Sequence, residues 1–397
     1  MLKKGLILTL FLFSFIPAFS QEKSPKNSEH ISKFLKGNIS DKTLAVREAS
    51  GDDAIWLSSK AIEFTLENKA ILGNDRDLDG LAVAAILSIS PENITKSSEL
   101  DKKEFEKQFI QLFNEFKSSN TVQIALLTKI VTLKESLSLK DFVAVLNNYL
   151  MTNTVQDIDS SVFKSALTAF ESIGNSETFI ILYNFLNNQK YSAYHKQLEK
   201  TISLLIPRFM DETLGLIQTA NMNQLKSIFN LAEKNSTISK NNRCEISEKV
   251  LTKSILLMDS TSQVSTVDIE IQINALKILT ENKWTRASNI AISYFRLAKV
   301  MFVNNIISEE QFITTISSLS SVAPIDSVSE LTIYLEELNS QKEKGNQISV
   351  NLVLSVINTL GAIGDKSAFD SLLAVTYLNY DESVLTAARE ALSGLRW

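Results

Sequence analysis

The sequence predicts an all-α protein built as an α-α superhelix, a right-handed solenoid of about eight to nine helical pairs. The 397-residue chain has only 11 Gly and 5 Pro, where average usage would give roughly twenty-eight and twenty, so long uninterrupted helices are favoured. Apolar residues recur at helical spacing along most of the chain. Similar segments also recur at a regular interval, which is typical of stacked repeats.

The helical spacing is clearest between positions 105 and 116, where five apolar residues share one helix face. They fall at i, i+4, i+7, i+8 and i+11: Phe105, Phe109, Leu112, Phe113 and Phe116. Aromatic residues at this spacing usually lie between packed helices. We therefore expect this stripe to be core, and a partner-binding groove is the alternative.

Segments 352–360 and 384–395 repeat the helical pattern. Counting all such segments gives about nineteen helices joined by short loops. Residues that commonly cap helices, Ser98, Ser308 and Asp381, precede three of the expected helices. Period-2 alternation typical of strands is absent from the sequence.

The first thirty residues are expected to lie outside the solenoid. Lys3 and Lys4 precede an apolar run over residues 6–15, and Ala18-Phe19-Ser20 offers a cleavage site, so residues 1–20 resemble a secretory signal peptide. The apolar run is too short to span a membrane. We expect a periplasmic or secreted protein with a flexible lead-in at residues 21–30 and no integral span after cleavage. An uncleaved anchor is the alternative.

The remaining chain is expected to form two parts of one solenoid. The polar stretch 234–243 (KNSTISKNNR) is the best candidate for a hinge between them. This divides the solenoid into an N-terminal part, residues 31–235, and a C-terminal part, residues 244–397. Shorter polar breaks lie at 259–266 and 340–349.

Composition limits the possible partners and chemistry. With 40 basic and 45 acidic residues the chain is mildly acidic, which argues against nucleic-acid binding. Cys244 is the only cysteine, so an intrachain disulfide is impossible and a buried thiol is expected. His30, in the expected lead-in, and His195, at an expected helix start, lack metal-ligand spacing. Known catalytic motifs are missing, and we predict no cofactor.

The segment GNDRDLDG at residues 73–80 is the only metal candidate. Asp75, Asp77 and Asp79 alternate as in the front half of an EF-hand calcium loop. The twelfth loop position, which should be a bidentate Glu, is instead Ile86. The three aspartates are therefore expected to form a turn and the first turn of a helix, where acids are favourable. Weak calcium binding, in a calcium-stabilised adhesion module, is the alternative.

The last forty residues carry the clearest repeat. Gly364 can end one helix with a positive φ, Asp365 can cap the next, and the small Ala388 and Ala391 allow close helix approach. This stretch resembles the HEAT-like (armadillo-type) repeat family, whose short repeats also occur in bilin lyases, and the resemblance implies stacked helical pairs. Leu385 stands where that family prefers Arg. The matching residues are Leu360, Ile363, Gly364, Asp365, Ala368, Leu372, Leu373, Asp381, Val384, Ala388, Ala391 and Leu392.

The same pattern recurs twice earlier in the chain. At an offset of 306 residues, Asp381 corresponds to Asp75, and the apolar positions that follow correspond to Leu78, Ala82, Ala85 and Ile86. At an offset of 190, the segment around Gly364 corresponds to the segment 170–182 around Gly174. A period of about 38 residues fits both offsets, eight times and five times.

These observations lead to a functional expectation. A solenoid presents a long surface suited to other proteins, so we expect an exported, non-catalytic protein-binding scaffold or adaptor in a bacterial envelope-associated assembly. The alternative is a small-ligand binder or lyase-like enzyme that uses the solenoid groove. Asn38, Asn93 and Asn235 lie in Asn-x-Ser/Thr sites, which would matter only in a eukaryotic secretory pathway.

Overall fold

The computed structural model describes residues 28–259 and 266–396, and in these two ranges the protein is all-α, as predicted. The described residues hold α-helices numbered to α21 and four short 3-10 helices, with no strand. The excess over nineteen includes helices such as the six-residue α5, which is too short for a periodicity to reveal. The predicted signal peptide and residues 21–27 of the lead-in lie outside the described residues.

The chain divides into two compact units, one ending at Phe142 and the other beginning at Val143. The boundary falls inside α8 (Lys140–Thr152), and the predicted hinge at 234–243 lies within the second unit. The first unit contains α1 (Glu29–Lys36), α2 (Ile39–Glu48), α3 (Gly51–Leu72), α4 (Arg76–Ser88), α5 (Pro91–Lys96), α6 (Glu99–Glu115) and α7 (Asn120–Leu133). Its helices begin at Glu29, two residues earlier than expected, because Ser28 caps α1.

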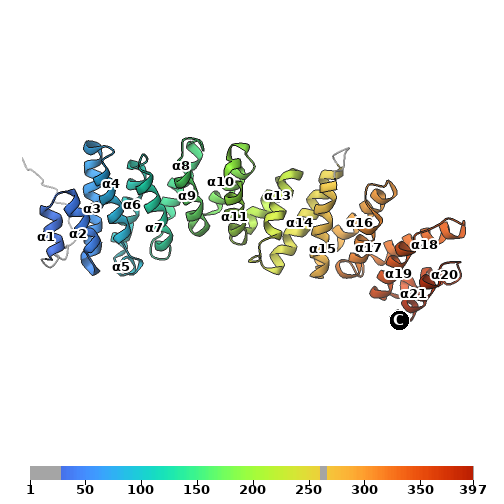
Figure 1. Cartoon of the computed structure of the whole chain (residues 1–397). Helices are drawn as coiled ribbons and strands as arrows, with labels where there is room; N and C mark the ends of the chain where they lie inside the picture. Colours follow the sequence, from blue (N-terminus) through green and yellow to red (C-terminus); the bar gives the residue numbers. More distant parts are fainter. Residues whose placement is uncertain (1–27, 260–265, 397) are drawn as a thin grey trace, which may run out of the picture. The chain divides into compact units, whose positions relative to one another are not determined.

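The second unit contains most of the helices (Figure 1). Its α-helices are α9 (Ser160–Ile173), α10 (Ser176–Leu186), α11 (His195–Leu205), α12 (Met210–Thr219), α13 (Met222–Glu233), α14 (Lys240–Asp259), α15 (Thr266–Glu281), α16 (Ser288–Val303), α17 (Glu309–Val322), α18 (Val328–Glu343), α19 (Val350–Ile363), α20 (Phe369–Val375) and α21 (Glu382–Ser393). The 3-10 helices are η1 (Gln189–Tyr194), η2 (Ile206–Arg208), η3 (Thr285–Ala287) and η4 (Lys366–Ala368).

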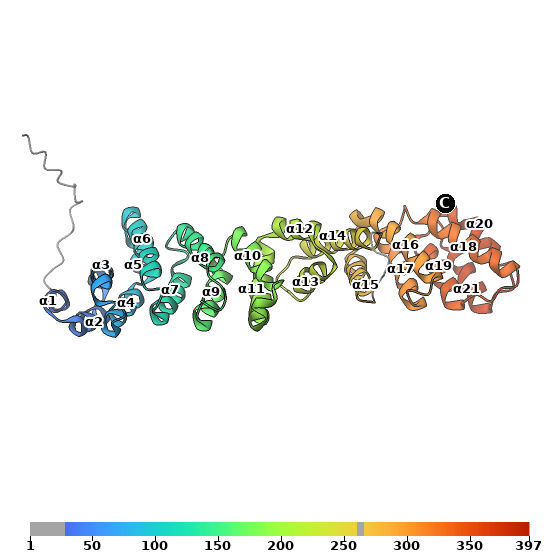
Figure 2. The same ribbon diagram turned by 90° about the horizontal axis from the view of Figure 1, so that it is seen from above.

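Within each unit, consecutive helices pack as pairs and the pairs stack in chain order (Figure 2). The first unit has α1/α2, α3/α4 and α6/α7, and the second has six pairs from α10/α11 to α20/α21. The second helices of successive pairs in a unit pack on one another, as α15, α17, α19 and α21 do. This arrangement covers the apolar face of each pair with the next pair.

The element order confirms the predicted repeat period. Helices α4 and α21 are both second helices of their pairs, and they begin at Arg76 and Glu382. Counting from one pair to the next, α21 lies eight pairs after α4. Helices α9 and α19 begin at Ser160 and Val350, five steps apart. Both spacings are therefore close to 38 residues per pair, although single steps vary.

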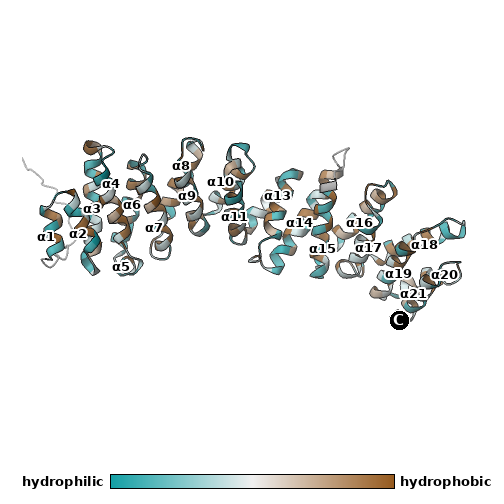
Figure 3. Cartoon of the chain, viewed as in Figure 1, coloured by the Kyte–Doolittle hydropathy of each residue, from teal (hydrophilic) through white to brown (hydrophobic). Residues whose placement is uncertain are grey.

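The core lies between the two layers of helices, and Figure 3 shows hydrophobic and hydrophilic segments alternating along the same helices. The stripe between positions 105 and 116 is buried throughout, which confirms the core interpretation. Within it the rings of Phe105 and Phe109 lie 6.4 Å apart. Phe113 meets Phe142 edge-on at 5.6 Å. The aromatic side chains thus fix the packing of α6 in the first unit.

Polar side chains connect neighbouring pairs. The Lys129 ammonium donates to the carbonyls of Leu87 and Ile89, at 2.8 and 2.7 Å, at the end of α4. In the second unit, Arg208 donates to the carbonyls of Ser172 and Gly174 after α9, at 3.3 and 2.8 Å. A cation here satisfies helix-end carbonyls that lack intrahelical partners. In these two places, one pair therefore caps a helix of the pair before it.

The C-terminal repeat shows the expected local geometry. Gly364 ends α19 with a φ of 70°, and Asp365 caps η4 by accepting from the Ser367 amide at 2.8 Å. Gly361 lies against Ala391 of α21, which explains how closely the two helices approach. Asp381 stands at the start of α21 but makes no capping side-chain hydrogen bond. By contrast Ser98 and Ser308 both cap their helices, as expected, and each does so in a capping box.

The middle copy of the repeat differs at its glycine. Gly174 has a φ of −56° and so lacks the left-handed conformation of Gly364. A Cβ at this position would lie 2.7 Å from the Phe170 carbonyl oxygen, so the absence of a side chain is still required. Asn175 caps α10 through a capping box with Thr178. The sequence match therefore preserves the small residue but not its backbone conformation.

The polar stretch at 234–243 is a hydrogen-bonded loop followed by the first turn of α14. The Asn235 side-chain amide donates to the Ser203 carbonyl, and Asn235 Oδ1 accepts from the Thr237 amide at 2.9 Å. The Arg243 guanidinium donates to the Asn235 carbonyl at 2.9 Å. Asn235 and Ile238 are buried, so the loop is anchored to the helices on either side.

Candidate functional site

Asp75, the first residue of the calcium candidate, is a helix cap. It is the N-cap of α4, and its Oδ1 accepts hydrogen bonds from the amides of Asp77 and Leu78, both at 2.9 Å. These bonds satisfy backbone N–H groups that have no partner within the helix. The expected helix start at Asp75 is confirmed.

The other two aspartates occupy different environments. Asp79 Oδ1 lies 3.7 Å from Nζ of Lys69, a side chain that is almost fully buried. That ammonium also sits 4.2 Å from the centroid of the Phe116 ring. Asp77 lies exposed in the first turn of α4, where its charge is favourable for the helix dipole.

The three carboxylates therefore have separate surroundings in the first unit. Asp75 binds backbone amides, Asp79 faces Lys69, and Ile86 is buried as expected. In residues 28–259 and 266–396, no group of three or more His, Cys, Asp or Glu is placed to hold a metal ion.

The two histidines and the cysteine lie on separate helices. His30 is in α1 rather than in a flexible lead-in, which corrects that expectation. His195 is the first residue of α11, as expected. Cys244 is fully buried in α14, and burial raises the pKa of its thiol despite the nearby cations Lys240 and Arg243. Among the described residues, none of the three belongs to a group of three or more potential metal ligands.

The Asn-x-Ser/Thr sites also have structural partners. Asn38 forms a capping box at α2, and the Asn93 amide donates to the Gly51 carbonyl at 3.3 Å. Asn235 is buried, with its side-chain amide directed to Ser203. A glycan on folded Asn235 would displace this contact.

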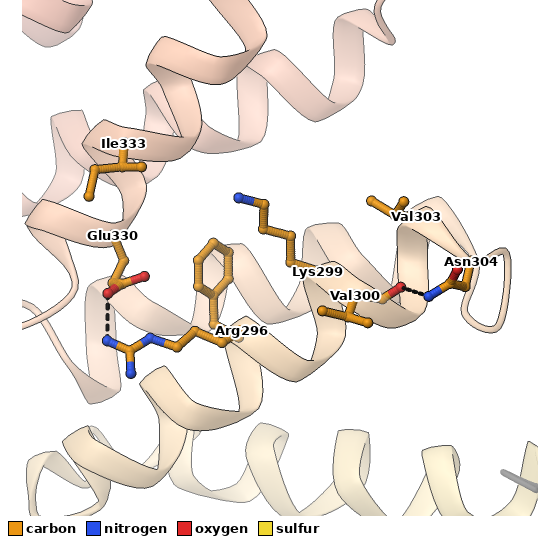
Figure 4. Close-up of a pocket in the computed structure, with 8 residues that line it drawn as sticks. Arg296, Lys299, Val300, Val303, Asn304, Glu330 and Ile333 are labelled. Carbon is orange, nitrogen blue, oxygen red and sulfur yellow. Dashed lines mark hydrogen bonds and ion pairs between the residues drawn. The ribbon is translucent and has the colours of Figure 1, made fainter. Parts of the chain in front are cut away.

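A concavity lies between α16 and α18 in the second unit (Figure 4). We call it the α16/α18 groove, with a volume of about 370 Å³. Helices α14, α16, α18 and α20 are the first helices of successive pairs. Helix α14 packs directly on α16, and α18 packs directly on α20. Between α16 and α18, ion pairs connect the two helices across the groove. Its lining residues are Phe295, Arg296, Lys299, Val300, Val303, Asn304, Glu330 and Ile333.

Three exposed apolar side chains open into this groove. Val300 is 57% exposed, Val303 71% and Ile333 50%. The valines come from the last turn of α16 and the isoleucine from α18 (Figure 4). Single exposed apolar residues are ordinary, but three that line one hollow mark a surface that another molecule can cover.

Ion pairs bridge the two helices beside the apolar residues. Arg296 donates to Glu330 at 2.6 Å, and Lys299 Nζ lies 2.6 Å from a Glu337 carboxylate oxygen. The hydrogen bond to Glu330 raises the pKa of Arg296. The α16 wall is therefore basic and the α18 wall acidic.

The ring of Tyr334 lies beside the ion pair between Lys299 and Glu337. Lys299 Nζ lies 4.9 Å from the centroid of the buried Tyr334 ring. Burial, and then the charges of Glu337 and Glu309, raise the pKa of the Tyr334 hydroxyl well above its usual range. Tyr334 also meets Phe295 edge-on at 6.1 Å. The aromatic core thus holds Lys299 and its partner in place.

The local sequence explains why α16 exposes apolar residues. Its buried side includes Ala291, Phe295 and Ala298, which cover the core. Val300 and Val303 fall outside that stripe, so α16 is apolar on more than one face near its end. A helix with a second apolar face normally has a second neighbour. Sequence reasoning missed this signal.

The groove can bind an apolar segment between charged walls. Its lining combines paired charges with exposed apolar side chains, an arrangement that is suited to binding. A scan against models of known protein families finds no match for the chain, and a search of the curated proteins finds none either.

In the described ranges, no helix has both the length and the apolar character needed to cross a membrane.

Proposed function

We propose that the protein is an exported, non-catalytic scaffold that binds other proteins through its helical-repeat surface, in a bacterial envelope-associated assembly. The observation that carries the proposal is the α16/α18 groove, where Val300, Val303 and Ile333 are exposed together. The resemblance of residues 359–397 to HEAT-like repeats supports it, since stacked pairs offer extended binding surfaces. The signal-like N-terminus supports export.

A protein partner fits the groove better than a small ligand. The groove is open to solvent and combines apolar residues with basic and acidic walls, as protein interfaces do. A small-ligand site would bury most of its ligand and usually holds a few unpaired polar groups. Here Arg296 and Lys299 are already paired with Glu330 and Glu337.

The test is site-directed crosslinking in the cells that produce the protein. The only native cysteine, Cys244, is fully buried, so Val303→Cys would carry the reactive thiol at the groove. Leu256→Cys is the matched control, because Leu256 is an exposed apolar residue on α14 of the same unit. We expect a defined protein adduct from Val303→Cys and none from Leu256→Cys.

A second substitution links the adduct to the groove. Ile333→Asp places a charge among the apolar residues from the opposite helix, and it should remove the adduct without loss of helicity because Ile333 is half exposed. Equal adducts at both cysteine positions, or none at either, would contradict the proposal.

A further inference from the structure

A second groove lies between α17 and α19, in the layer opposite α16 and α18. We call it the α17/α19 groove, with a volume of about 480 Å³. Its walls come from the first three turns of α17 and from α19. The lining residues are Glu309, Glu310, Ile313, Ser317, Asn351, Leu354, Ser355 and Asn358.

The lining carries charge of one sign only. Glu309 and Glu310 are acidic, and every other lining residue is neutral. Glu309 Oε1 accepts a hydrogen bond from the Ser349 hydroxyl at 2.7 Å, whereas the exposed Glu310 carboxylate has no ion-pair partner among the residues that the structure describes. This differs from the α16/α18 groove, where cations and anions are paired across the opening.

Helix capping alone does not account for both acids. Acids in a first helical turn are favourable for the dipole, but Ser308 and Gln311 already form a capping box at α17. The first turn of α12 also holds two acids, Asp211 and Glu212, and these line neither of the two grooves. The acids of α17 differ because a hollow with apolar and amide walls lies beside them.

The geometry points to the α17/α19 groove as the docking site for a lysine or arginine side chain on a basic segment of a partner protein. No lining residue is a cation, so a positive charge for the carboxylates of Glu309 and Glu310 would come from the partner. Ile313 and Leu354 offer apolar surface to the stem of such a side chain. The assignment rests on the proposed protein-binding function for its choice of partner.

The test measures binding of a fluorescent peptide of alternating arginine and serine by anisotropy, with a glutamate-serine peptide as the negative probe. The variant is Glu309→Gln with Glu310→Gln, which keeps side-chain size and the acceptor for Ser349. The matched control is Asp211→Asn with Glu212→Gln, which removes the same charge from the first turn of a helix outside both grooves. Binding of the basic peptide should weaken about tenfold in the first variant and less than about twofold in the control.

A third variant strengthens the test. Glu310→Lys reverses the charge of an exposed residue, so it should fold and should weaken binding further than the neutral variant. Equal weakening in the groove variant and the α12 control would show a non-specific attraction to net negative charge and overturn the assignment. Unchanged binding in Glu310→Lys would overturn it as well. Because the crosslink at Val303 reports on the other groove, failure here is distinguishable from failure of the proposed function.

Discussion

The close approach of α19 and α21 makes Gly361 a position where alanine should destabilise the protein. Gly361 lies inside α19, and glycine in a helix interior normally costs about 0.5–1 kcal/mol relative to alanine. At this position, however, an added Cβ would lie 2.9 Å from Ala391 Cβ and 3.2 Å from its Cα. The local preference and the packing therefore predict opposite signs for Gly361→Ala.

The magnitude follows from the contact distance. Carbon atoms in contact prefer about 3.5–4.0 Å, so the two helices must move apart by about 0.6–1.1 Å or bend. Overpacking of this kind costs about 1–3 kcal/mol, which exceeds the gain in helix propensity. We expect Gly361→Ala to lower the free energy of unfolding by about 1–2 kcal/mol.

The matched control is Gly215→Ala in α12. Gly215 is exposed inside a helix, and a Cβ there would meet no atom within 4 Å. This substitution should raise the free energy of unfolding by about 0.5–1 kcal/mol. Urea denaturation followed by far-ultraviolet circular dichroism measures both. If Gly361→Ala stabilises the protein as Gly215→Ala does, the inferred α19–α21 contact is wrong.

Three further predictions concern single side chains. Asp75→Ala should lower the free energy of unfolding by about 0.5–2 kcal/mol, because the cap of α4 is lost. Asp75→Asn keeps a capping oxygen and should change the free energy of unfolding far less. If calcium raises the melting temperature and Asp75→Ala abolishes that rise, the calcium alternative is supported instead. Cys244 should react with a thiol reagent only on unfolding, because it is buried and its thiol pKa is raised; rapid labelling of the native protein would contradict this. Hydrogen bonds from Ser367 lower the pKa of Asp365, so the stabilising contribution of the Asp365 carboxylate should be present at neutral pH and lost as pH falls through that lowered pKa. In an NMR titration, the titration midpoint of Asp365 should be higher in Ser367→Ala than in the native protein. An unchanged midpoint would count against these hydrogen bonds.

The sequence was enough to predict the helical class and the register of the repeats. Asp75 and Asp381 mark the starts of α4 and α21, and the segments around Gly174 and Gly364 mark the ends of α9 and α19. These positions are predictable because capping and small-residue packing depend on residues within a few positions of one another. The left-handed conformation of Gly364 did not transfer to Gly174, since a sequence match does not fix φ.

The two grooves were beyond sequence reasoning for a physical reason. Each needs side chains from helices more than thirty positions apart, such as Arg296 and Glu330, and depends on how far those helices stand from each other. Spacing between helices is set by packing of the intervening layer, which periodicity does not report. A partial signal existed in Val300 and Val303, which fall outside the buried stripe of α16.

The spacing of the polar contacts between neighbouring pairs has a consequence for how the chain folds and yields to force. Side-chain hydrogen bonds such as Ser203 to Leu231 and Gln108 to Ser59 join residues 28 and 49 positions apart, a small fraction of 397 residues. A molecule whose contacts are this local has low relative contact order, so it should fold rapidly from many starting points. Under tension it should extend in small successive steps, because losing one pair leaves the contacts among the more distant pairs intact.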